Sequence, residues 1–461
     1  MIIKNFNDLI SNVKTEQEIY ARKTILELLD IGINSVLPRH IIPRSVQLEN
    51  GNLIIQNFVF NLSKTKNIYV VGAGKASGAM AEELEQILSS YITNGLINIP
   101  EGTKKNYKTQ KIKFNEASHP IPSKSGIIGT QKMVKMLKDA QKNDLIIVLL
   151  SGGGSSLLTY QVKEINLNQI QILNELLIKS GATIQEINIV RKHCSKIKGG
   201  QLAKLGYPAT IITLILSDII GNPLDSIASG PTVPDPSTYG QAINILKKYH
   251  IWELLDGSIQ QHLKNGLNRI VPETPKPFNK IFSKTYTIII GDIKIACESI
   301  KQAANQKGFK SYIYSSEIIG ETRNVGKNFL QDAKKMYHEI RFDQSKPIIL
   351  IAGGETTVTV KGEGIGGRLQ EMGLVLISEF QNLPEMVFAA MGTDGIDGFT
   401  DVAGVIIDRH SAMLMRHKKI DNIKFLNNND SYHFFKKLGD SLIVTGPTGT
   451  NVNDLMIIGI F

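Results

Sequence analysis

Cysteine and long apolar runs are scarce in this sequence, and each shortage excludes a class of protein. The 461 residues include only 2 cysteines, Cys194 and Cys297. Two distant thiols give neither a disulfide framework nor a cysteine metal cluster, so a reducing cytoplasm is expected. Apolar runs such as 145–150 and 209–216 fall far short of the roughly 18–20 residues that span a bilayer. Residues 1–8 also lack the apolar core of a signal peptide. We therefore expect a soluble cytoplasmic protein without a membrane partner.

The charge and composition are those of a folded protein with a basic surface. Hydrophobic residues make up 42%, charged residues 20%, and the net charge is +10. This charge predicts an ordinary basic enzyme surface, and attraction of anionic or phosphorylated ligands is the alternative. The lysine run between 104 and 113 has little aromatic company and lies in no nucleic-acid-binding motif, so we predict a solvated loop and no nucleic-acid partner.

Short apolar runs alternate with helical segments along both halves of the chain. In the first half these runs are 68–71, 145–150 and 211–216; in the second they are 286–290, 348–351, 386–390, 441–444 and 456–460. The alternation is typical of a parallel sheet with helices on both faces. Because the length suits two domains, we predict a Rossmann-like α/β domain over 1–240 and a second α/β domain over 286–461. A proline-rich connector, 241–285, would carry one or two helices, and the last strands can pack back on the first domain.

Glycine-rich turns occur at six places, and most follow a predicted strand: 72–78, 151–155, 199–200, 353–354, 364–367 and 446–449. Open α/β sheets bind ligands at this end of their strands, and glycine lets a phosphate approach backbone amides. A tight structural turn is the alternative at each place. We predict phosphate or nucleotide binding by Gly72, Gly74, Ser151, Gly152, Gly153, Gly154, Ser155, Lys198, Gly353, Gly354, Glu355, Thr448 and Asn451.

Basic residues accompany several of these turns. Lys75 follows the first turn, but Ala76 breaks the Walker pattern, so the chain is not a P-loop ATPase. Arg191 and its basic neighbours can clamp an acidic substrate or a phosphate tail, and the fork of Arg368 suits phosphoryl or carboxylate oxygens. We predict substrate binding by Lys75, His119, Arg191 and Arg368. The glycines of 72–78, followed by Glu101, also form a loose dinucleotide fingerprint.

Carboxylates in a glycine-broken loop suggest a metal site. Asp394, Asp397 and Asp401 follow a predicted strand, but their spacing does not match an EF-hand. Mg²⁺ needs only one or two carboxylates besides phosphate and water. Because acidic residues also form turns for local reasons, a structural loop is the alternative. We predict Asp218, Asp394 and Asp397 as ligands of Mg²⁺ or another divalent cation.

Taken together, the motifs resemble the glycerate 2-kinase family, whose C-terminal module is called MOFRL. The strings that carry the resemblance are Gly72-Ala73-Gly74-Lys75-Ala76, Ser118-His119-Pro120, Ser151-Gly152-Gly153-Gly154-Ser155, Val190-Arg191-Lys192-His193, Ile227-Ala228-Ser229-Gly230-Pro231-Thr232, Gly353-Gly354-Glu355-Thr356, Gly366-Gly367-Arg368, Thr393-Asp394-Gly395 and Thr450-Asn451-Val452-Asn453-Asp454.

The resemblance implies transfer of the ATP γ-phosphoryl group to the 2-hydroxyl of D-glycerate, with a divalent cation. By the same resemblance Lys75, Arg368 and Asp394 are the expected catalytic residues, and we place the active site in a cleft between the domains. The alternatives are an NAD(P)-dependent hydroxypyruvate reductase and a non-catalytic sugar-phosphate sensor. A monomer or homodimer is expected.

Overall fold

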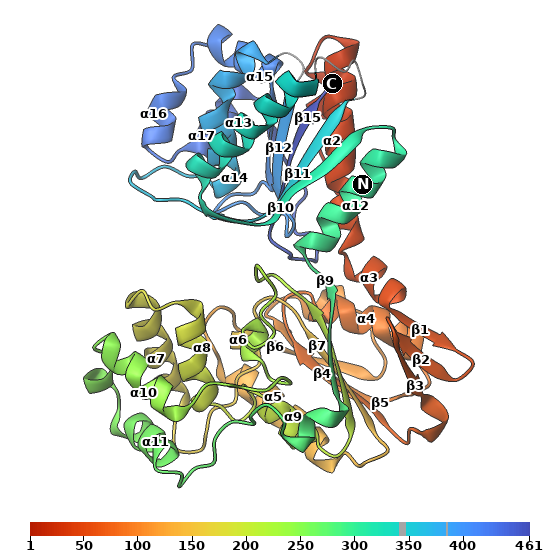
Figure 1. Ribbon diagram of the computed structural model, residues 1–461, viewed down its shortest axis with the longest axis vertical. Helices are drawn as coiled ribbons and strands as arrows, with labels where there is room; N and C mark the ends of the chain where they lie inside the picture. The colour runs from red at the N-terminus through yellow and green to blue at the C-terminus, as the bar shows by residue number, and fades with distance from the viewer. Residues whose placement is uncertain (341–346, 384–385) are drawn as a thin grey trace. The chain divides into compact units, whose positions relative to one another are not determined.

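The chain forms two compact α/β units. The computed structural model describes residues 1–340, 347–383 and 386–461 (Figure 1). One unit comprises residues 41–290, and the other joins residues 1–40 to 291–461. Among the described residues no helix is both long and apolar enough to cross a bilayer.

The unit of residues 41–290 is built on a six-stranded sheet. Its strands, in spatial order, are β6 (Ile112–Ala117), β5 (Ile92–Pro100), β4 (Ile68–Ala73), β7 (Leu145–Leu150), β8 (Thr210–Leu216) and β9 (Thr285–Gly291). The pairings from β6 through to β8 are all parallel, which confirms the predicted sheet. Every residue of β7 is buried, as expected of a central parallel strand. Strand β9 was expected to open the second domain, but it forms the edge of this sheet.

Helices pack against this sheet and also form a second core beside it. Helices α5 (Lys124–Asp139) and α9 (Gln201–Gly206) share one core with β7, and α4 (Ser77–Leu88) packs on β4 and β5. The second core joins α7 (Leu167–Lys179), α8 (Ile184–His193), α10 (Tyr239–Lys248) and α11 (Gly257–Leu267). The predicted helices between the prolines are therefore present, but they pack within this unit. The remaining elements are α6 (Gly154–Leu157) and a small antiparallel sheet of β1 (Val46–Glu49), β2 (Asn52–Ile55) and β3 (Phe58–Asn61).

The other unit contains a mixed six-stranded sheet. Its spatial order is β10 (Lys310–Glu321), β11 (Ile348–Thr357), β15 (Asp454–Ile460), β12 (Met386–Gly392), β13 (Gly404–Asp408) and β14 (Leu442–Ile443). Among the described residues of this sheet, only β10 and β11 pair in parallel, and the other pairings are antiparallel. The last strand of the chain, β15, lies between β11 and β12, and all its residues are buried.

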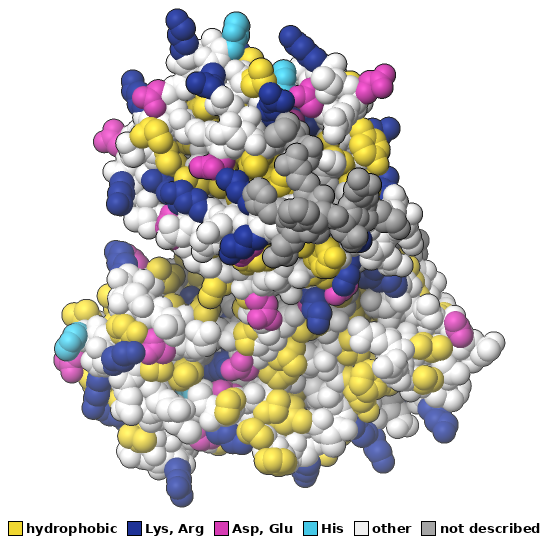
Figure 2. All heavy atoms as spheres, turned by 45° about the horizontal axis from the view of Figure 1, so that its top comes forward, with side chains coloured by type: hydrophobic (Ala, Val, Ile, Leu, Met, Phe, Trp, Pro, Cys, Tyr) yellow, Lys and Arg dark blue, Asp and Glu magenta, His cyan; other side chains and the backbone are white. Residues whose placement is uncertain are grey.

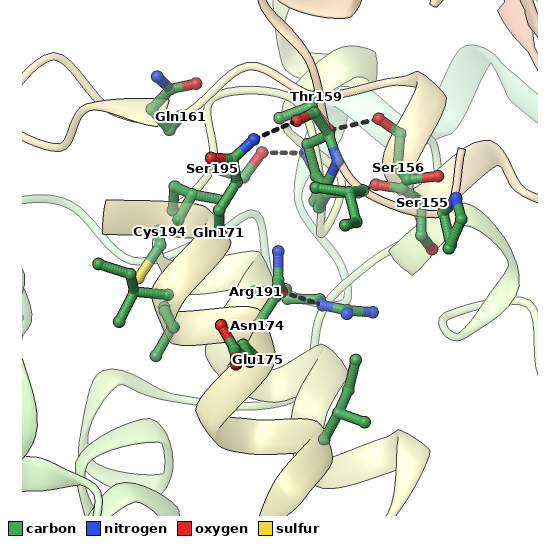
Figure 3. A pocket seen from close by; sticks show the side chains of 18 of the residues that line it. Ser155, Ser156, Thr159, Gln161, Gln171, Asn174, Glu175, Arg191, Cys194 and Ser195 are labelled. Carbon is green, nitrogen blue, oxygen red and sulfur yellow. Dashed lines mark hydrogen bonds between the residues drawn. The ribbon is translucent and has the colours of Figure 1, made fainter. Parts of the chain in front are cut away.

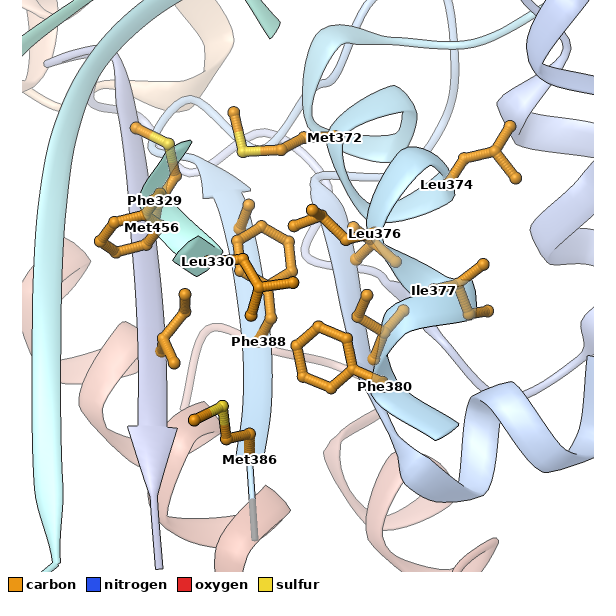
Figure 4. Close-up of a cluster of buried hydrophobic side chains, with 14 of the residues drawn as sticks. Phe329, Leu330, Met372, Leu374, Leu376, Ile377, Phe380, Met386, Phe388 and Met456 are labelled. Atoms are coloured by element: carbon orange, nitrogen blue, oxygen red, sulfur yellow. The ribbon is translucent and has the colours of Figure 1, made fainter. Parts of the chain in front are cut away.

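Helices from both ends of the chain cover the mixed sheet. Helices α2 (Glu16–Ser35) and α12 (Ile293–Gln306) pack on each other and on its strands. A large apolar cluster, which includes Phe329, Phe380, Phe388 and Met456, joins the sheet to other helices (Figure 4). The other helices of this unit are α1 (Phe6–Ser11), α13 (Thr322–Ile340), α14 (Arg368–Leu376), α15 (Arg409–His417), α16 (Asn422–Asn427) and α17 (Ser431–Leu438), and α3 (Pro38–Ser45) spans the boundary between the units.

A buried arginine links α2 to the second half of the chain. Arg22 is fully buried, and its guanidinium contacts the carboxylates of Asp408 at 2.6 Å and Asp440 at 3.2 Å. These contacts and the apolar face of α2 place residues 1–40 in the same unit as 291–461. The compact units therefore divide the chain differently from the boundaries expected at 240 and 286.

Candidate functional site

Two of the predicted glycine turns meet at the carboxyl ends of β4 and β7. The backbone N–H of Lys75 donates to the carbonyl of Gly152 at 2.8 Å, and that of Ala76 donates to Oγ of Ser151 at 3.0 Å. A Cβ on Gly74 would lie 2.1 Å from this Oγ, so only glycine permits the close approach. The side chain of Lys75 is exposed at the carboxyl ends of these strands.

His119 and Asp218 lie beside the same turns. A Cβ on Gly153 would lie 2.7 Å from the imidazole of His119, and one on Gly152 would lie 2.1 Å from a carboxylate oxygen of Asp218. Burial, together with the charge of Lys75, lowers the pKa of His119, so this imidazole favours its neutral form. The structure thus brings Lys75, His119, Asp218 and the turn 151–155 together, as the parallel sheet predicts.

Arg191 and Lys198 complete this group. Nζ of Lys198 donates to the carbonyl of Ser155 at 2.6 Å, and Nε of Arg191 donates to Oδ1 of Asn174 at 2.7 Å. Burial and the neighbouring Arg191 lower the pKa of Lys198 to about 7, and burial lowers that of Arg191 to about 10. Within the described parts of the chain, no carboxylate forms an ion pair with either cation. Both line a cavity of about 680 Å³, and Figure 3 shows Arg191 and Asn174 pointing toward each other in it.

A second group lies around Arg368, where strands of the mixed sheet end. This arginine begins α14 and holds Asp454 with two hydrogen bonds, of 2.6 and 3.0 Å. Its third contact, at 3.0 Å, is to Glu355. Residue Asp454 pairs with Gly354 of β11 and Gly392 of β12, so three strand ends converge here.

Asp454 is a functional candidate that the sequence analysis did not single out. It is 1% exposed and opens a strand that is otherwise apolar, and this is the signal that could have identified it. A buried carboxylate needs a partner, and Arg368 supplies one. Burial raises the pKa of Asp454 to about 7, although the guanidinium of Arg368 works against the rise. Asp454 thus fixes the position of Arg368.

Asp394 lies next to the predicted turn 446–449. It follows β12, is partly exposed, and accepts a hydrogen bond from the backbone N–H of Ile396 at 3.1 Å. Its carbonyl accepts a bond from the N–H of Thr448 at 3.2 Å. Asn451 accepts from the N–H of Asn453 at 3.1 Å, which shapes the approach to β15. Asp394, Thr448 and Asn451 therefore belong to neighbouring loops.

Two predicted groups make contacts that differ from those expected. Asp397 is buried, and its carboxylate accepts from the N–H groups of Leu369 and Gln370 and from the Gln370 side chain, which caps the start of α14. Its predicted metal role is not favoured by these contacts. Gly353 and Gly354 lie inside β11 rather than in a turn after it. A Cβ on Gly354 would lie 2.1 Å from the carbonyl oxygen of Ile318, so close strand packing explains this glycine.

The predicted residues thus form two groups, one in each unit. Lys75, His119, Asp218, Arg191 and Lys198 belong to residues 41–290, whereas Glu355, Arg368, Asp394, Asp397, Thr448 and Asn451 belong to the other unit. That one active site draws on both groups stays a prediction. Among the described residues no cluster of three or more His, Cys, Asp or Glu side chains is placed to hold a metal ion.

Basic side chains are scattered over the face drawn in Figure 2, where Lys and Arg stand among uncharged and apolar groups. The cations named above, in contrast, lie beside glycine turns or at strand ends. Such cations beside glycine turns are typical of α/β enzymes that bind phosphorylated or carboxylate ligands.

Comparison with known proteins identifies the family. Residues 24–264 match a family described as a domain of unknown function, DUF4147, and residues 348–454 match the MOFRL family. A glycerate 2-kinase of Pyrococcus horikoshii is 39% identical over 95% of this chain and 96% of its own length. A D-glycerate 2-kinase of Thermotoga maritima is 36% identical over 95% and 97%, respectively. The crystal structure of a glycerate kinase from the latter organism matches with a TM-score of 0.82 at 35% identity, covering 95% of this chain and 99% of that one. The chain therefore belongs to the glycerate 2-kinase family.

Proposed function

We propose that this protein transfers the γ-phosphoryl group of ATP to the 2-hydroxyl of D-glycerate, giving 2-phosphoglycerate and ADP. The observation that carries the proposal is its similarity, along nearly the whole chain, to proteins named glycerate 2-kinase. The basic side chains of residues 41–290, together with Arg368 of the other unit, support it, because both substrates are anionic. A cytoplasmic setting and a monomeric or homodimeric state belong to the same proposal.

Each group of residues has a role in this reaction. Phosphoryl transfer needs alignment of the reactants and stabilisation of charge more than covalent chemistry by the protein. The turn 151–155, with Lys198, holds phosphate oxygens. Lys75 and Arg368 neutralise the transferring group and bind the glycerate carboxylate, and His119 and Arg191, in the unit of residues 41–290, bind substrate oxygens. Asp394 orients or deprotonates the attacking hydroxyl.

A divalent cation fits some of the predicted ligands better than others. Asp394 is partly exposed at a strand end, and Asp218 lies beside the glycine turn, so each can offer one carboxylate to a phosphate-bound Mg²⁺. Asp397 does not fit as well, because its oxygens already accept three hydrogen bonds from α14. When bound, Mg²⁺ neutralises negative charge on the phosphates.

A coupled ADP assay tests the proposal. ADP release should require D-glycerate, ATP and a divalent cation together, and ³¹P NMR should identify 2-phosphoglycerate as the product. ADP release without dependence on glycerate, or phosphorylation at the 3-position, would contradict it.

A hydroxypyruvate reductase is the second candidate, since a relative from Agrobacterium vitis that is 37% identical over 84% of this chain carries that name provisionally. The structure does not favour the dinucleotide fingerprint behind this alternative. A Cβ on Gly78 would lie 2.4 Å from the ring of Tyr107, so this glycine serves helix packing, and Glu101 accepts a bond from Ser118 at 2.7 Å. Oxidation of NAD(P)H by hydroxypyruvate, measured by absorbance, would support the reductase.

A further inference from the structure

The cavity drawn in Figure 3 lies wholly within residues 41–290 and extends well beyond the glycine turn. Its wall runs from His119 and Gly153 past Thr159 and Gln161 to helices α7 and α8. Its volume, about 680 Å³, is in the range of sites that enclose ligands of about the size of a nucleotide. D-Glycerate, a three-carbon acid, would leave most of this space empty.

Part of the cavity wall is basic. Arg191 and Lys198 line it together, and Lys198 is 5% exposed. A buried lysine without a carboxylate partner favours its neutral form, and a bound anion favours its charged form. No carboxylate pairs with either basic group in the described ranges, although Glu175, which pairs with Lys179, also lines the cavity. Ser155, whose carbonyl accepts from Lys198, connects this part of the wall to the turn 151–155.

The cavity wall also carries exposed apolar side chains. Ile121, Ile172 and Ile178 line the cavity and are 62%, 44% and 62% exposed, respectively. Exposed isoleucines in a cavity wall suit a flat apolar ring, because covering them removes apolar surface from water. The same wall includes amide side chains: Asn168 and Gln171 of α7, and Gln161, whose buried Oε1 accepts no hydrogen bond. These groups can recognise the polar edge of a ring.

We infer that this cavity is the nucleotide site, with the base against the isoleucines and the phosphates at Arg191 and Lys198. A ligand with an apolar ring and several negative charges uses both kinds of side chain, whereas a small hydroxy acid uses only the basic ones. The inference rests on the proposed function, since ATP is the donor there, and it assigns adenine recognition to residues 41–290.

Substitution of an isoleucine that lines the cavity tests the assignment. Ile172→Glu places a carboxylate at a partly exposed position, so the fold should persist, and its melting temperature should match that of the unchanged protein. We expect the KM for ATP and the Kd for ADP by calorimetry to rise about tenfold or more, with the KM for D-glycerate changed less than about twofold. The matched control is Ile184→Glu, an exposed isoleucine of α8 that does not line the cavity and should leave both constants unchanged.

The outcomes separate this inference from the proposed function. Unchanged nucleotide affinity in Ile172→Glu, or a rise in the KM for glycerate alone, overturns the inference. A protein that binds ADP through this cavity but releases no ADP with glycerate overturns the function and leaves the inference standing. A second measurement uses 8-azido-ADP, which on illumination should label a peptide from residues 119–179; labelling confined to residues 291–461 overturns the assignment.

Discussion

At the scale of single residues, Lys75 is the side chain on which the proposed chemistry depends most. It is exposed at the end of β4, beside the turn 151–155, where it can reach a phosphoryl group. We expect Lys75→Ala to lower kcat by about 10²–10⁴, because one charge that stabilises the transition state is lost. The measurement is the coupled ADP assay. Lys104→Ala, at another exposed lysine, is the control and should keep full activity. Near-normal turnover in Lys75→Ala would refute the assignment.

Asp454 should make the reaction depend on pH through Arg368. Its pKa is raised to about 7, so it is ionised above that pH and holds Arg368 best there. We expect kcat/KM to rise between about pH 6 and 8, and Asp454→Asn to lose this limb and to lower kcat/KM throughout.

The control for this pH profile is Asp401→Asn, since Asp401 is an exposed carboxylate bonded to Tyr432. It should keep the rise. An unaltered profile in Asp454→Asn would mean that another group titrates.

At the scale of elements, the start of α14 depends on Asp397. Its carboxylate accepts from two backbone N–H groups of the first turn, which have no partner inside the helix. We expect Asp397→Ala to lower the free energy of unfolding by about 1–3 kcal/mol, with Arg368 at the first position of α14 less well placed. Urea unfolding followed by circular dichroism measures the loss. A stability equal to that of Asp401→Ala would show that the cap contributes nothing.

Strands β4, β7 and β8 of the first sheet could be predicted from sequence, because buried parallel strands leave apolar runs that end in small residues. Strands β5 and β6 were not predicted, because polar residues interrupt their apolar runs. The same logic predicted that Lys75 and the turn 151–155 follow strands, but His119 follows β6, a strand that the sequence analysis did not predict. The partners of each element could not be predicted in the same way. Periodicity indicates that α2 has an apolar face but not which sheet receives it. Similarly, a carboxylate that caps a helix and one that binds a metal have the same sequence signal, as Asp397 shows.

At the scale of the whole molecule, the two groups of residues can be tested for a common task. If Lys75 and Arg368 act on one phosphoryl group, their losses should not multiply. We expect the double variant Lys75→Ala with Arg368→Ala to have a kcat well above the product of the two single effects. Single-turnover rates of the four proteins measure the coupling. Strictly multiplicative losses would argue for independent sites.

Arg22 ties the beginning of the chain to its second half. Removing it leaves Asp408 and Asp440 buried without their cation, which costs about 3–5 kcal/mol. We expect Arg22→Met to speed amide hydrogen exchange in α2 and β13, and exposed Arg39→Met to leave it unchanged. Equal protection in both variants would show that apolar packing alone holds α2.

The central position of β15 has a consequence for how the protein is made. A chain leaves the ribosome from its beginning, so α2 emerges early but its sheet cannot close until residues 454–460 follow. Residues 41–290 can fold during this interval, as domains do in synthesis. The apolar face of α2 therefore stays exposed to chaperones and to other proteins while several hundred further codons are translated, because the strands that bury it are made last.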